Sequence, residues 1–109
     1  MTTTTFRLRK GFRRSRKDYP QGVIGIYDNG GKTIDRYTVV FEPHQNEGSP
    51  HKSYPILGMN NAPFSPRGFG QHETILFRYT RQAGERTINF ADLPTDCQKC
   101  VFQDLEPSI

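Results

Sequence analysis

Apolar and polar residues alternate along several stretches of this chain in the way that β-strands require. Residues 23–27 form a short apolar run, and residues 35–42 place Tyr37, Val39 and Phe41 on one face of a half-buried strand. Between them lies the chain's strongest turn signal, Asp28-Asn29-Gly30-Gly31, which suits a hairpin. The same reasoning predicts further strands over 74–80 and 86–90, and a third strand over 54–59, which Pro55 would confine to a sheet edge.

The segments between these strands are rich in turn-forming residues. Residues 44–53 are polar and predict an exposed loop, while residues 60–71 are dense in proline and glycine and predict a shaped loop. A helix is predicted over 94–106, because Pro94 suits a first turn and Pro107 ends the segment. Its buried stripe would contain Leu93, Cys97, Val101 and Leu105.

These elements predict an α+β fold: a bent antiparallel sheet of four to five strands with one C-terminal helix packed on it. The 109 residues allow one domain, with 33% hydrophobic residues and a mean hydropathy of −0.75. Eight Phe and five Tyr provide bulky core material despite this low hydrophobicity.

Charge divides the chain into two parts. Residues 6–17, FRLRKGFRRSRK, contain seven basic residues and no acidic one, whereas the rest has eight basic and eleven acidic residues, a net charge of −3. We therefore expect a basic, flexible N-terminal arm over residues 1–20 and a single compact domain over 21–109. The predicted nucleic-acid-binding residues are Arg7, Arg9, Lys10, Arg13, Arg14, Arg16 and Lys17, whose cations would neutralise phosphates.

No stretch has the length of a membrane span or the apolar core of a secretory signal, so a cytoplasmic protein without membrane contact is expected. Several segments resemble a family of small uncharacterised proteins encoded by phages, plasmids and related bacterial mobile elements. They are residues 27–33 (YDNGGKT), 35–41 (DRYTVVF), 58–59 with 63–71, and 90–94 with Gln98. The resemblance implies an accessory protein in a bacterial host cell and provides no catalytic residues.

Two short motifs need comparison with known sites. Gly31-Lys32-Thr33 matches the end of a phosphate-binding loop, but Ile26 stands where that pattern needs its first glycine, which favours a hairpin turn. Cys97 and Cys100 form one C-x-x-C pair, for which buried thiols are favoured over a metal or redox site. We expect no metal, no cofactor and no catalytic residues.

The loop over 60–71 is a second candidate surface. Phe64, Arg67, Phe69 and Gln71 are residue types that anchor interfaces, and Lys32 and Arg36 of the first hairpin are predicted to lie close to them. The alternative is that Phe64 and Phe69 turn inward and close one end of the core.

Two functional classes follow. The first is a non-enzymatic accessory protein that binds nucleic acid or a nucleoprotein complex through its arm. The alternative is an inhibitor of a host defence system (anti-CRISPR-like) or of another host machine, which binds a host protein. A small enzyme is third. The sequence makes no prediction of the oligomeric state.

Overall fold

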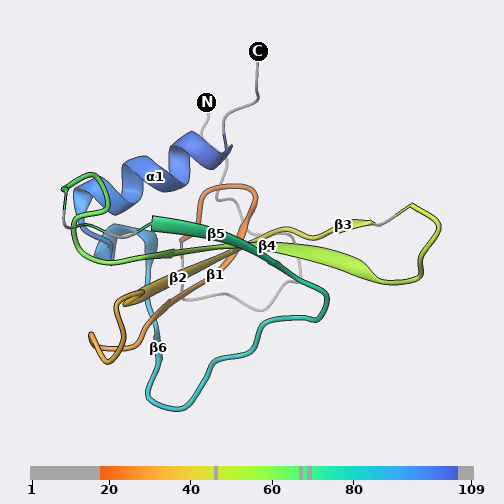
Figure 1. The fold of residues 1–109 in the computed structure, drawn as a ribbon, viewed down its shortest axis with the longest axis horizontal. Coiled ribbons are helices and arrows are strands. Elements are labelled where there is room, and N and C mark those ends of the chain that lie inside the picture. The colour runs from red at the N-terminus through yellow and green to blue at the C-terminus, as the bar shows by residue number, and fades with distance from the viewer. Residues whose placement is uncertain (1–17, 46, 67, 69, 106–109) are drawn as a thin grey trace.

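The fold is α+β, as predicted: an antiparallel sheet with one C-terminal helix along one face (Figure 1). The computed structural model describes residues 18–45, 47–66, 68 and 70–105. Its elements are β1 (Val23–Asp28), β2 (Tyr37–Phe41), β3 (His44–Gln45), β4 (Lys52–Met59), β5 (Gly70–Ile75), β6 (Arg86–Thr87), the 3₁₀ turn η2 (Phe90–Asp92) and α1 (Thr95–Leu105). Within these residues the sheet has six strands in the order β3-β4-β2-β1-β6, with β5 also paired to β4.

The predicted hairpin joins β1 and β2. Ile26 pairs with Val39 and Asp28 with Tyr37, so the second strand begins two residues later than the alternation indicated. Gly30 and Gly31 have φ angles of 78° and 89°, a region that glycine enters without steric cost. The Asn-Gly-Gly signal therefore located the turn correctly.

β2 is buried on both faces, although its alternation predicted a strand with one polar face. All five of its residues are buried, including Thr38 and Val40 on the side away from α1. On that side Tyr79, from the segment 76–85 that passes beneath the sheet in Figure 1, lies beside Thr38. Tyr79 packs its ring 5.0 Å from that of Tyr27, and its hydroxyl donates to both carboxylate oxygens of buried Glu85.

The path of residues 76–85 shows that the prediction of a strand over 74–80 was wrong. β5 ends at Ile75, because the chain then leaves the sheet edge and crosses below it. Leu76 and Phe77 are 59% and 67% exposed, although the alternation had placed Phe77 on a strand. Alternation reports which side chains share a face, and it cannot show whether a neighbouring strand is available for pairing.

β4 was predicted as an edge strand, and this too was wrong. It pairs with β2, and further along with β3, on one side and with β5 on the other, and it begins at Lys52, inside the predicted loop over 44–53, where β3 also lies. Pro55 is tolerated because the pairing with β2 ends at Ile56, so the proline meets no backbone of β2.

The C-terminal helix agrees closely with its prediction. α1 begins one residue after Pro94 and presents Cys97 and Val101 to the core, together with Leu93 before it and half-buried Leu105. These residues pack against Ile26, Val39, Leu57 and Met59 of the sheet. The strand predicted over 86–90 is only two residues long, because Asn89 and η2 turn the chain toward the helix.

The packing of Cys97 predicts a measurable loss of stability on truncation. Its side chain is fully buried and its thiol donates to the Asn60 carbonyl at 3.1 Å. Cys97→Ala should lower the free energy of unfolding by about 1–2 kcal/mol, measured by urea denaturation. Cys100→Ala is the matched control, since Cys100 is only half-buried, and should lose less. Equal losses of unfolding free energy in the two variants would show that the buried packing of Cys97 does not anchor α1 to the sheet.

Candidate binding surfaces

The seven cations predicted to bind nucleic acid lie outside the described residues, but the point where their segment joins the body is well determined. Tyr19 donates its hydroxyl to the Ile88 carbonyl at 3.1 Å, and Pro20 is buried. Burial raises the pKa of Tyr19 to about 12, which keeps the phenol a neutral donor. Residues 19 and 20, which the sequence placed in the arm, therefore pack against the body.

The four described residues of the second predicted surface do not gather at one place. Phe64 lines a hollow of about 180 Å³ together with Leu57 and Cys100, on the side of α1. Gln71 belongs to β5 rather than to the loop, and it lines a hollow with Thr38 and Glu73 on the opposite face. Arg67 and Phe69 lie outside the described residues.

The exposure of the Phe64 side chain distinguishes between the two interpretations of this residue. It is 51% exposed and therefore does not turn inward to close the core. An exposed phenylalanine beside a shallow hollow is available to a partner, which is the kind of anchor that the sequence suggested.

Arg36 and Lys32 diverge from each other across the hairpin. Lys32 lies beside Gly84, where a β-carbon would approach its Nζ to 2.6 Å. Arg36 turns to Asp28 and holds its guanidinium 5.1 Å from the centre of the Tyr37 ring. A hollow of about 320 Å³ lined by Arg36 and residues 60–62 places the hairpin beside the start of the predicted loop, although neither Lys32 nor Phe64 lines it.

Asp28 is the most strongly held charge described in the domain. Its Oδ1 accepts from Arg36 Nε and from the Gly30 amide, each at 2.8 Å, and its Oδ2 accepts from Nη2 of Arg36 and of Arg86 at 3.2 Å. The hydrogen bond from Arg36 is the main reason that the pKa of this buried carboxyl falls to about 2. The cluster ties the β1–β2 hairpin to β6.

The hairpin turn cannot act as the phosphate-binding loop that its sequence resembles. The amides of Gly31 and Lys32 both donate to Oδ1 of Asn29, at 2.8 and 3.0 Å, and the amide of Gly30 donates to Asp28. A phosphate-binding loop needs these amides free. The structure thus supports the turn interpretation.

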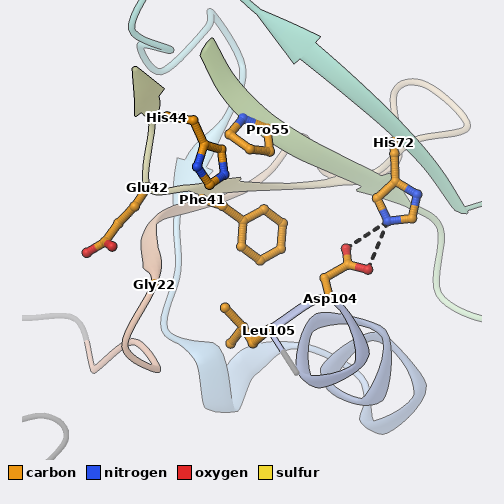
Figure 2. Close-up of a pocket in the computed structure, with 8 residues that line it drawn as sticks. All are labelled: Gly22, Phe41, Glu42, His44, Pro55, His72, Asp104 and Leu105. Carbon is orange, nitrogen blue, oxygen red and sulfur yellow. Dashed lines mark hydrogen bonds and ion pairs between the residues drawn. The ribbon is translucent and has the colours of Figure 1, made fainter. Parts of the chain in front are cut away.

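A groove of about 430 Å³ opens between the sheet and the end of α1 (Figure 2). His72 of β5 points across it to Asp104 of α1, with Nε2 at 2.9 and 2.8 Å from the two carboxylate oxygens. Phe41, Pro55 and Leu105 provide apolar walls. The sequence did not indicate this pair, because 32 residues separate its members and no motif links them.

The groove offers limited chemistry. An imidazole held by a carboxylate can serve as a base, but the eight lining residues include no Ser, Thr, Cys or Lys that it could activate. In the described ranges, no three His, Cys, Asp or Glu residues come together as a metal site. The groove thus combines apolar walls with one hydrogen-bonded pair, His72 and Asp104.

Comparisons with protein-family models, with curated proteins and with solved structures found no match. The resemblance to a phage and plasmid family stays a prediction. Over the part of the chain that the structure describes, no helix is both long and apolar enough to cross a membrane.

The Asp28 cluster predicts a specific pH dependence of stability. A lowered carboxyl pKa stabilises the fold at pH values above about 4, its range in an unfolded chain, and this stabilisation is lost as the pH falls towards 2. Asp28→Asn should therefore lower the free energy of unfolding by about 2–3 kcal/mol at pH 7, with a difference from wild type that shrinks below pH 4.

Thermal unfolding followed by circular dichroism at pH 7, 4 and 2 measures this difference. Glu42→Gln is the matched control, because Glu42 is exposed and in Figure 2 its side chain points away from the groove. A loss in Asp28→Asn that is the same at all three pH values would contradict the electrostatic explanation.

Proposed function

We propose that this chain is a non-enzymatic accessory protein of a phage or mobile element, which binds nucleic acid or a nucleoprotein complex in the bacterial cytoplasm through its basic arm. The observation that carries the proposal is the separation of charge: seven cations without an acid in residues 6–17, on a body of net charge −3. Each cation that contacts a phosphate releases condensed counterions, which favours binding without regard to base sequence.

The arm also carries two aromatic residues, Phe6 and Phe12, among its cations. Aromatic rings stack on unpaired bases and supply binding energy that salt does not screen. This combination favours single strands, or distorted duplex, over regular duplex.

The described residues favour separate binding roles for the basic arm and for the body of the domain. Tyr19 and Pro20 fix the root of the arm against the core, so a ligand held by the arm is held close to the domain. The acidic body repels phosphates, which confines their contact to the arm and leaves the domain surface to a protein.

Inhibition of a host defence system or another host machine is the second candidate. Three exposed apolar side chains favour it: Phe64, Leu76 and Phe77 at 51%, 59% and 67% exposure. Exposed apolar side chains that lie together are typical of protein-binding surfaces, and Leu76 and Phe77 are neighbours in the chain.

Neutralising the arm tests the proposal. If about five of its cations contact phosphates, the logarithm of the binding constant for duplex DNA should fall with a slope of about −4 to −5 against the logarithm of salt concentration. A full-length variant with all seven arm cations replaced by Gln should lose this binding, measured by fluorescence anisotropy over a salt series. A variant with Lys52, Arg78 and Lys99 replaced by Gln is the control and should keep it, since these exposed cations belong to the body.

If both variants bind DNA as tightly as the wild type, the arm is not the contact. Affinity capture from bacterial lysate, with and without nuclease, then addresses the second candidate. A protein captured after nuclease treatment and lost in Phe64→Ser would favour inhibition through the domain.

A further inference from the structure

β5 is longer than the other outer strands of the described sheet. β3 and β6 are each two residues long, which leaves little backbone for another chain to pair with. β5 is six residues long, and among the described strands it pairs only with β4. Five of its six residues are exposed. One side of β5 therefore presents a row of backbone donors and acceptors to solvent.

This edge lacks the usual protection against pairing. Its sequence, GQHETI, has no proline, no lysine and a single acidic residue, Glu73. Leu76 and Phe77, both largely exposed, follow it directly. An open backbone edge next to exposed apolar side chains is typical of a surface that another strand covers.

We infer that the occupant is β5 of a second copy of this chain, paired antiparallel about a two-fold axis perpendicular to the sheet. In an antiparallel pair, residues directly opposite each other point to the same side of the sheet. In a symmetric pair of β5 strands, one residue must therefore lie opposite its own copy, and the two-fold axis passes between these two copies. Four registers pair at least three residues of β5, centred on Gln71, His72, Glu73 or Thr74. Those centred on Gln71 and Thr74 pair only three residues each, and the one centred on Glu73 sets two Glu73 carboxylates against each other, which is unfavourable.

The register centred on His72 is self-complementary. It pairs residues 70–74 and places Gln71 of each copy opposite Glu73 of the other, so an amide donor meets a carboxylate acceptor twice. The two side chains are of suitable reach and share one face, since Gln71 Nε2 lies 3.4 Å from Glu73 Oε2 within a single strand. On the other face the two His72 side chains lie opposite each other across the axis, each held by a hydrogen bond to Asp104 of its own copy.

Antiparallel pairing places the start of β5 in one copy beside the end of β5 in the other. Leu76 and Phe77 of one copy, which follow β5, would thus lie near the start of β5 of the second copy. A dimer would also carry two basic arms and bind nucleic acid with increased avidity, although the pairing itself does not depend on the proposed function.

Charge swaps at two exposed positions test the register. In sedimentation velocity over a concentration series, with nuclease-treated full-length protein at high salt, the wild type should form a dimer. Gln71→Glu should weaken dimerisation by roughly tenfold, because it opposes like charges at two symmetric places, and Gln71→Lys should strengthen it. The double variant Gln71→Glu/Glu73→Gln should restore wild-type affinity, because it exchanges the two partners.

Both positions are exposed, so none of these variants should change the melting temperature of the monomer. The arm-neutralised variant should dimerise as the wild type does, which separates this interface from any association through nucleic acid. A wild type that stays monomeric at every concentration would overturn the inference. So would a dimer that Gln71→Glu leaves unchanged and Glu73→Gln strengthens, since that pattern belongs to the register centred on Glu73.

Discussion

The burial of β2 on both faces is the constraint on which the rest of the domain depends. A strand covered on one side by α1 needs a second cover, because Thr38 and Val40 face away from the helix. On that side Tyr79 of the segment 76–85 lies beside Thr38 and packs its ring against Tyr27, and the hydrogen bond from its hydroxyl to Glu85 links the two ends of the segment. To reach this face the chain leaves the sheet after Ile75. This ends β5 and exposes the side chains of Leu76 and Phe77.

The electrostatic arrangement serves two separate purposes. Within the body, three carboxylates have specific partners: Asp28 has two arginines, Asp104 has His72, and Glu85 has Tyr79. These pairs hold elements of the fold together. The positive charge of residues 6–17 has no acid within the segment itself, and this separation of charge is the basis of the proposed function.

The same chain segment links the fold to the proposed contacts. The loop over 60–69 carries Phe64 outward, β5 presents its open edge, and the residues after Ile75 expose two more apolar side chains. These features are consecutive in sequence, and the end of β5 and the exposure of Leu76 and Phe77 follow from the path of the chain across the second face of β2.

The sequence by itself determined the local features of this protein. Asn29-Gly30-Gly31 located the hairpin turn, because only residues that tolerate positive φ suit it, and the four-residue spacing of Leu93, Cys97, Val101 and Leu105 located the helix and its buried face. Charge counting separated the arm from the body. Each of these signals depends on residues that are close together in the chain.

Only the tertiary structure decided which strands are central, where they end and which side chains meet. Pro55 suggested an edge, yet β4 has neighbours on both sides, and the alternation over 74–80 suggested a strand that has no partner beyond Ile75. Arg36 was predicted to face a partner, yet its guanidinium binds Asp28, and Gln71 and Phe64 lie on opposite faces. Pairing and burial depend on contacts between residues far apart in the chain, such as His72 and Asp104, and local patterns carry no information about which distant residues will meet.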